Sequence, residues 1–198
     1  MEGIIPLMSN ESKRPRESES STEITNQNPE TIHFDSATEI PSDDPWGGLS
    51  EERHTLLIRI AEEIIPYNKF LGLKVESLKK GYCVIRIPWQ DQLIGDPSRP
   101  ALHGGVTSCI ADVAGGFSCF ALLENPTDAV STIDLRVDYL RPGKMKDIFC
   151  EGKVERMGNR VAQTRMSVYS GANPAHGTPE DKHLIAMAHG VYNVVRRK

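Results

Sequence analysis

Several features that would point to other classes of protein are scarce in this 198-residue chain. Its four cysteines, Cys83, Cys109, Cys119 and Cys150, show neither CxxC nor metal-site spacing, which favours a reducing cytoplasm over an oxidising compartment. The N-terminus has no sustained apolar segment, which argues against a secretory signal. Basic residues form no dense patch and the formal net charge is −4, so no nucleic-acid partner is expected.

Charge divides the chain into two parts. Residues 1–48 carry ten acidic and three basic side chains and few large apolar residues. Such a segment cannot bury enough surface to offset the entropy of ordering it, so we expect a disordered acidic tail. Residues 49–198 carry 20 basic and 17 acidic side chains and form the predicted domain, whose mildly basic balance suits a small anionic ligand.

The most informative segment is the apolar run 104–123, GGVTSCIADVAGGFSCFALL, in which Asp112 is the one charged residue. The run is long enough for a membrane span, but its carboxylate, hydroxyl groups and glycines argue against one. We therefore expect a helix enclosed by protein. A carboxylate placed there is either satisfied by structural hydrogen bonds or used for its reactivity.

Periodicity around this run predicts the remaining elements. We expect a helix that Pro66 ends, a hairpin turn at Lys79-Lys80-Gly81, a loop over 90–101, and a bend at Gly190 in the last strand. Thr132 and Asp134 are expected to share one polar strand face. The predicted helix covers 49–65, and the predicted strands cover 73–78, 82–87, 130–140, 147–156, 161–169 and 183–195.

The order of these elements predicts the fold class. Strands do not alternate with crossover helices, which disfavours a parallel doubly wound sheet. A helix that is apolar on nearly all faces must be enclosed. The sequence therefore predicts an α+β fold in which an antiparallel curved sheet wraps around a central apolar helix.

Three motifs together resemble the hotdog-fold acyl-CoA thioesterases of the phenylacetate-pathway (PaaI-like) type. They are the run Leu102-His103-Gly104-Gly105, Asp112 seven residues later, and the segment 131–142, STIDLRVDYLRP. The resemblance covers residues 68–195. It implies a hotdog fold, assembly as a homodimer or homotetramer, and hydrolysis of acyl-CoA thioesters without a metal or an organic cofactor.

The resemblance also implies roles for two catalytic groups. The amide of Gly104 would point at the thioester oxygen, and Gly105 would let the substrate approach the backbone. Asp112 would act as general base or nucleophile. Because Asp112 lies eight residues after Gly104, more than two helical turns away, the resemblance implies a site in which Asp112 meets Gly104 of a partner chain. Alternatively, the glycines only permit a tight turn into the helix.

Two further residues have competing interpretations. A histidine can act as a general base at neutral pH, but the resemblance implies that His103 organises the loop by hydrogen bonding. Thr132 matches a position at which relatives place a hydroxyl group that orients the attacking water. A solvated polar face shared with Asp134 explains Thr132 equally well.

Coenzyme A would require cationic side chains near its phosphates. The candidates are Arg141, Lys144 and Arg160, each with a solvated surface position as the alternative. The end of the acyl pocket could be built by Phe117, Phe120 and Tyr139.

The sequence also departs from its relatives at two positions. Many of them carry Asn or Gln about six residues before the histidine, where this chain has Pro97 next to Asp96. A related branch carries a hydroxyl residue where Gly116 stands here.

Two other functions fit the same residues. A hotdog dehydratase or hydratase would use a histidine with an acid, but the spacing from His103 to Asp112 matches the hydrolases better. A non-catalytic acyl-CoA sensor would use the same pocket, but such regulators usually carry a DNA-binding module, and residues 1–48 show no helix-turn-helix pattern.

Overall fold

The computed structural model describes residues 32–33, 44, 47–174, 176 and 182–197. The predicted tail 1–48 therefore lies almost entirely outside the described residues, and its disorder stays a prediction. Within it, Ile32–His33 form a short strand, β1, that pairs antiparallel with Met157 and Arg156.

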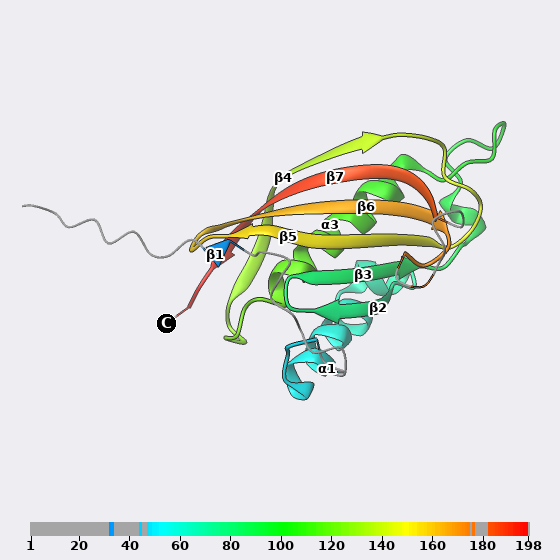
Figure 1. The fold of residues 1–198 in the computed structure, drawn as a ribbon. Helices are drawn as coiled ribbons and strands as arrows, with labels where there is room; N and C mark the ends of the chain where they lie inside the picture. The colour runs from blue at the N-terminus through cyan, green and yellow to red at the C-terminus, as the bar shows by residue number, and fades with distance from the viewer. Residues whose placement is uncertain (1–31, 34–43, 45–46, 175, 177–181, 198) are drawn as a thin grey trace, which may run out of the picture.

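One antiparallel sheet, in the order β2-β3-β5-β6-β7-β4, forms the body of the molecule (Figure 1). Its strands are β2 (Lys74–Lys79), β3 (Tyr82–Ile87), β4 (Ala129–Tyr139), β5 (Ile148–Met157), β6 (Val161–Gly171) and β7 (Lys182–Val195). These pairings confirm the predicted antiparallel α+β fold. The predicted bend at Gly190 is wrong: β7 is continuous there, and Gly190 pairs with Leu135 and Thr164.

The β2–β3 hairpin follows the sequence signal. Lys80 and Gly81 connect the two strands, and Gly81 has a φ of 71°, a left-handed conformation that glycine adopts without steric cost. Register shifts in β2, β4, β5 and β7 add the local bending and twist that let the sheet curve.

Helix α3 (Gly104–Phe120) lies along one face of this sheet (Figure 1). It packs tightly against the sheet at Gly152, where an added Cβ would lie 2.6 Å from the carbonyl oxygen of Ala114. The helix buries Thr107, Ile110, Ala111, Ala114, Gly115, Phe117, Ser118 and Cys119. No helix in the described part of the chain is long and apolar enough to cross a membrane.

Three helical segments precede the sheet: α1 (Glu51–Arg59), the π-helical turn η1 (Ile60–Ile64) and α2 (Pro66–Phe70). Ser50 caps α1 by accepting a hydrogen bond from the Arg53 amide at 3.2 Å. The first helical segment ends before Pro66, as expected, because η1 stops at Ile64 and Ile65 is extended. Pro66 then starts the separate helix α2, because a proline in the first helical turn loses no intrahelical hydrogen bond.

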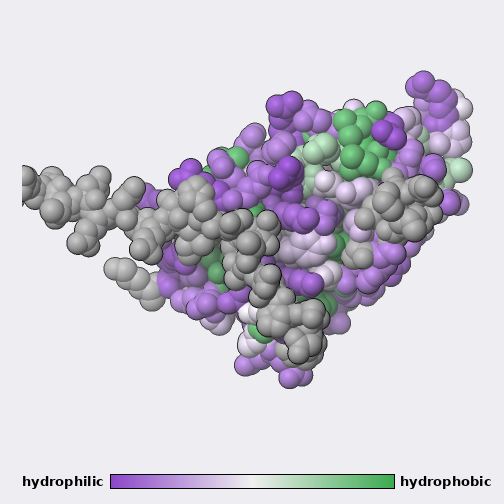
Figure 2. Space-filling view, in the orientation of Figure 1, coloured by the Kyte–Doolittle hydropathy of each residue, from purple (hydrophilic) through white to green (hydrophobic). Residues whose placement is uncertain are grey.

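The predicted loop 90–101 contains one 3₁₀ turn, η2 (Asp91–Leu93), before α3 begins. The face of the molecule seen in Figure 2 is largely hydrophilic, with a hydrophobic patch near the C-terminal end of β4. Tyr139 and Leu140, at that end, are among the exposed large hydrophobic residues. As the last strand in the sheet order, β4 has an outer edge that pairs with no strand in the described ranges.

Candidate active site

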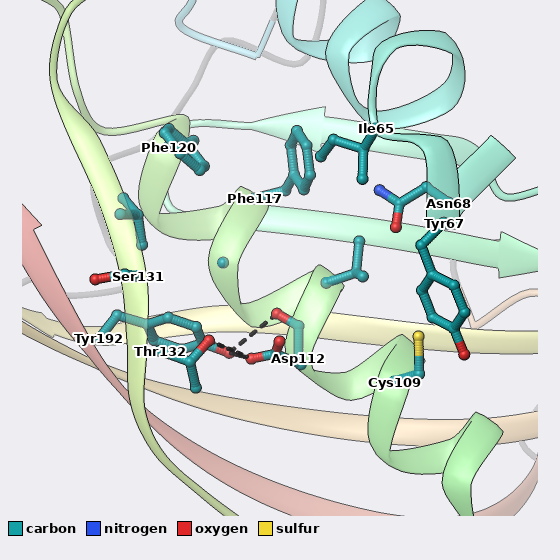
Figure 3. A pocket seen from close by; sticks show the side chains of 13 residues that line it. Ile65, Tyr67, Asn68, Cys109, Asp112, Phe117, Phe120, Ser131, Thr132 and Tyr192 are labelled. Atoms are coloured by element: carbon teal, nitrogen blue, oxygen red, sulfur yellow. Dashed lines mark hydrogen bonds between the residues drawn. The ribbon is translucent and has the colours of Figure 1, made fainter.

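Asp112 lies near the middle of α3, and two hydroxyl groups from the sheet bind its carboxylate (Figure 3). Thr132 Oγ1 donates to Oδ1 at 2.8 Å. Tyr192 Oη lies 3.3 Å from the same oxygen and 3.0 Å from the main-chain oxygen of Asp112. The carboxylate is thus held by the sheet, and it also lines a cavity.

This cavity, of about 460 Å³, lies between α3, α2 and the start of β4. Its walls are mainly apolar, and the rings of Phe117 and Phe120 pack with their centroids 5.8 Å apart. Further apolar walls come from Ile65, Val113 and Val130. A small carboxylate-bearing cavity with apolar walls can hold an acyl group beside a base.

The bulge in β4 explains why Thr132 reaches Asp112. Thr132 pairs with Tyr192 and Asp134 pairs with Val191, so the register shifts by one residue at Ile133. Adjacent residues of β7 point to opposite faces. Thr132 therefore faces α3, whereas Asp134 faces away from it. The expectation that Thr132 and Asp134 share one polar face is wrong.

Gly104 borders a different pocket at the first turn of α3. This pocket, of about 360 Å³, is also lined by Tyr139 and Arg141. The two pockets share no lining residue. The structure therefore does not bring Gly104 and Asp112 together within one chain. Main-chain N–H groups in a first helical turn, such as that of Gly104, have no partner within the helix.

The peptide unit that follows Gly104 is held at both ends. The Gly105 amide donates to Nδ1 of His103 at 2.9 Å, so this ring nitrogen acts as an acceptor. The Gly104 carbonyl accepts from Tyr139 Oη at 3.1 Å and from Ser108 Oγ at 3.3 Å, and the two hydroxyl oxygens lie 2.6 Å apart. The His103 contact is of the kind expected for a residue that organises the loop. Tyr139 lies here and not in the Asp112 cavity.

The three predicted CoA ligands lie in two places. Arg141 lines the Gly104 pocket. Lys144 lies in the same connection between β4 and β5, where its amide donates to Ser170 Oγ at 3.1 Å. Arg160 is exposed at the β5–β6 turn, at the opposite end of β5.

In the loop before His103, the carboxylate of Asp96 accepts hydrogen bonds from a neighbouring residue of the same loop. Asp96 Oδ1 accepts from the Ser98 amide at 2.9 Å and from the Ser98 hydroxyl at 2.6 Å. These bonds lower the pKa of the Asp96 carboxyl. Asp96 lines neither the Asp112 cavity nor the Gly104 pocket.

Sequence reasoning missed several residues of the Asp112 cavity, among them Asn68 and Tyr192. Asn68 is buried, and its side chain points from α2 toward the cavity, with Nδ2 donating to the Ala61 carbonyl at 3.0 Å (Figure 3). Tyr192 comes from β7, eighty residues after Asp112. The sequence signal that could have identified Tyr192 is its position on β7. It is a large side chain on the same strand face as the small residues Gly190 and Ala188.

Burial changes the acidity of two groups beside the carboxylate. It raises the pKa of the Tyr192 hydroxyl, and the nearby negative charge of Asp112 raises it further. The same two causes, burial first, raise the pKa of the Cys109 thiol to about 11. At neutral pH both groups are protonated, so Tyr192 remains a hydrogen-bond donor to Asp112.

Comparison with known proteins places this geometry in a family. Residues 100–174 match the family model of the thioesterase superfamily. The medium/long-chain acyl-CoA thioesterase YigI of Salmonella typhimurium is 32% identical over 142 residues, which cover 66% of this chain and 86% of the relative.

Solved structures show the same fold. A Shewanella oneidensis protein related to the thioesterase superfamily is 29% identical with a TM-score of 0.60, over 73% of this chain and 99% of that one. The PaaI protein of Escherichia coli has a TM-score of 0.60 at 18% identity, over 73% and 95% of the two chains. The chain belongs to the thioesterase superfamily and is a hotdog-fold thioesterase, a thioester hydrolase whose fold is like that of PaaI.

Proposed function

We propose that the protein hydrolyses acyl-CoA thioesters to a free acid and CoA, at a site shared by two subunits. The observation that carries the proposal is the Asp112 carboxylate, hydrogen-bonded by the sheet at the wall of an apolar cavity. Hydrolysis of a thioester needs such a base next to a bound acyl group. The name of the Salmonella relative, an acyl-CoA thioesterase, supports CoA as the thiol.

In the proposed reaction, Asp112 acts as the general base. The carboxylate takes a proton from a water molecule, whose oxygen attacks the thioester carbon. The oxyanion that forms accepts a hydrogen bond from the Gly104 amide of the partner subunit. The carbonyl then re-forms, the C–S bond breaks, and the CoA thiolate takes the proton that Asp112 accepted from water. The Thr132 hydroxyl donates its proton in a hydrogen bond to Asp112. Its oxygen lone pairs can therefore accept a hydrogen bond from the attacking water and orient it.

The other predicted residues have supporting roles in this proposal. His103 holds the first turn of α3 through Gly105, whose missing side chain leaves room for the substrate. Arg141 and Lys144 bind CoA phosphates near Gly104. Arg160 reaches them from the partner subunit.

The structure supports a homodimer, alone or paired into a homotetramer, in two ways. Each chain holds Asp112 and Gly104 in separate pockets. The outer edge of β4 pairs with no strand in the described part of the sheet, and long free edges favour pairing with another chain. The proposed steps require no cofactor. The four free thiols suit a cytoplasmic enzyme.

Thiol release from a panel of acyl-CoA thioesters tests the activity. Asp112→Asn preserves side-chain volume but removes the base, so we expect turnover to fall by at least about 100-fold. Asp134→Asn, on the opposite face of β4, is the matched control and should keep wild-type turnover. Wild-type turnover in Asp112→Asn would contradict the proposal. So would hydration of crotonyl-CoA or tight acyl-CoA binding without thiol release.

Isotope labelling tests the general-base role. In a single turnover in H₂¹⁸O, we expect the label in the released acid and none in the Asp112 carboxylate. Label in Asp112 would instead show that the carboxylate attacks the thioester and is then released by water.

A mixed dimer tests the shared site. Gly104→Pro removes the amide donor at a position where proline is tolerated, and the preceding His103 already has an extended conformation with ψ 130°. Gly104→Ala keeps the amide, and its Cβ would contact the Tyr139 ring at 3.4 Å, so it is the control.

A dimer of one Asp112→Asn chain and one Gly104→Pro chain contains one fully intact site if the site is shared. We therefore expect about half of the wild-type activity per mixed dimer, although each variant alone is nearly inactive. No recovery in verified mixed dimers would show that each site lies within one chain.

A further inference from the structure

Tyr192 is one of the largest fully buried side chains of the core. It lies next to the Asp112 carboxylate. The residue is 1% exposed, and its ring lies between β7 and the middle of α3, where its hydroxyl reaches Asp112 (Figure 3). A buried tyrosine hydroxyl must find a hydrogen-bond partner. Here it finds two on one residue: the main-chain oxygen at 3.0 Å and Oδ1 at 3.3 Å.

Three glycines lie next to this ring, and the absence of their side chains leaves room for it. A Cβ on Gly115 would overlap Tyr192 Oη, and one on Gly190 would lie 2.6 Å from Tyr192 Cε2. A Cβ on Gly116 would lie 3.7 Å from Cε1, in ordinary contact. Glycine within a helix costs about 1 kcal/mol relative to alanine. Gly115 therefore lowers helix stability but makes room for the Tyr192 hydroxyl at Asp112.

The two donors bind only one of the two carboxylate oxygens of Asp112. Oδ1 accepts from Thr132 at 2.8 Å and lies 3.3 Å from the Tyr192 hydroxyl. Thr132 approaches from β4 and Tyr192 from β7, so both donors restrain the carboxylate through Oδ1, and Oδ2 accepts no hydrogen bond from the described residues.

We propose that Tyr192 is a positioning residue that holds Asp112 in the rotamer in which Oδ2 faces the substrate. This inference rests on the proposed thioesterase function. Because the same hydroxyl also binds the main-chain oxygen of Asp112, it couples the rotamer to the local path of α3. Tyr192 itself touches no reacting atom. Its effect on the reaction passes entirely through Asp112.

Tyr192→Phe tests this inference, since it keeps the ring that fills the space between the glycines. We expect kcat to fall about tenfold, the size of one lost hydrogen bond to a charged group, with KM within about twofold because the apolar cavity is unchanged. Tyr169→Phe, a half-buried tyrosine of β6 that lies outside the Asp112 cavity, is the control and should keep wild-type kinetics. A wild-type kcat in Tyr192→Phe would overturn the inference. So would a rise in KM with unchanged kcat.

A double-mutant cycle separates positioning from general stability. If Tyr192 acts only through Asp112, Tyr192→Phe should not reduce the residual activity of Asp112→Asn any further. Multiplying effects would show an independent role and overturn the inference. The cycle also separates the two hypotheses: an active Asp112→Asn variant contradicts the proposed function, whereas an inactive one with a fully active Tyr192→Phe contradicts only the positioning role. If Tyr192→Phe folds poorly, Tyr192→Trp and Tyr192→His can be tested as well, since each carries a ring N–H donor. The values of kcat are then compared among the variants that fold.

Discussion

The hydroxyl group of Thr132 lies 2.8 Å from Oδ1 of Asp112, although the two residues come from different elements. The bulge at Ile133 turns Thr132 inward, so that it stands opposite Tyr192 on β7. Thr132, Tyr192 and Asp112 therefore form one hydrogen-bonded group, which joins the edge strand, its neighbour and the central helix.

This contact predicts different results for two substitutions of Thr132. Thr132→Val keeps the shape of the side chain but removes the donor, so we expect kcat to fall by roughly 10- to 100-fold, the range for a lost hydrogen bond to a charged group. Thr132→Ser keeps the hydroxyl and should lose less than about threefold. Steady-state kinetics of both variants checks this, and equal losses would contradict it.

Alanine substitutions at two adjacent glycines of α3 are expected to change the unfolding free energy in opposite directions. Gly115→Ala would place a Cβ against Tyr192 Oη and 3.0 Å from Met166 Sδ, and overpacking of this kind costs about 1–3 kcal/mol. Gly116→Ala meets only an ordinary contact at 3.7 Å and should gain up to about 1 kcal/mol from helix propensity. Urea denaturation of both variants measures the two changes in unfolding free energy. A stabilising Gly115→Ala would show that α3 is not close-packed there.

The thiol of Cys109 should react slowly at neutral pH. Its pKa is raised to about 11 by burial and by the charge of Asp112, so about one thiol in a thousand is ionised at pH 8. We expect the alkylation rate to rise about tenfold per pH unit up to about pH 11. Removing the negative charge in Asp112→Asn lowers the thiol pKa and speeds the reaction.

Alkylation by iodoacetamide with mass spectrometry provides the measurement. Cys83 and Cys150, which are 0% exposed, serve as internal controls and should react only on unfolding. Rapid labelling of Cys109 at pH 7 would contradict the raised pKa of this thiol.

Phe120 should help to set the acyl length. The ring is half-buried at the wall of the Asp112 cavity, next to Phe117. Phe120→Ala enlarges the cavity and is expected to raise kcat/KM for longer acyl chains relative to shorter ones, whereas Phe120→Trp should do the reverse. One added or missing methylene contact changes this ratio by about tenfold. Identical chain-length profiles in both variants would place the acyl group elsewhere.

Local signals in the sequence predicted the fold well. The apolar run after His103 predicted α3, and Lys80-Gly81 predicted the β2–β3 hairpin. Each of these signals depends on neighbours within one element. The absence of alternating helices and strands then left an antiparallel sheet as the remaining solution, which the structure confirms.

Long-range features of the site could not be predicted in the same way. The bulge at Ile133 depends on how β4 pairs with β7, and no residue within β4 specifies it. Tyr192 meets Asp112 across eighty residues, and Asn68 comes from the short helix α2, which the sequence analysis did not predict. Asp112, Gly104, His103 and Thr132 were predicted from the motifs, but Tyr192 and Asn68 were found only in the structure.

The position of β4 at the border of the sheet has a consequence for solution behaviour. An isolated subunit can keep its complete hydrophobic core while its two reactive groups remain in separate pockets. Under the proposed shared site, dilution below the dissociation constant of the dimer would abolish turnover while leaving the fold intact. Specific activity would then depend on enzyme concentration and return when the protein is reconcentrated.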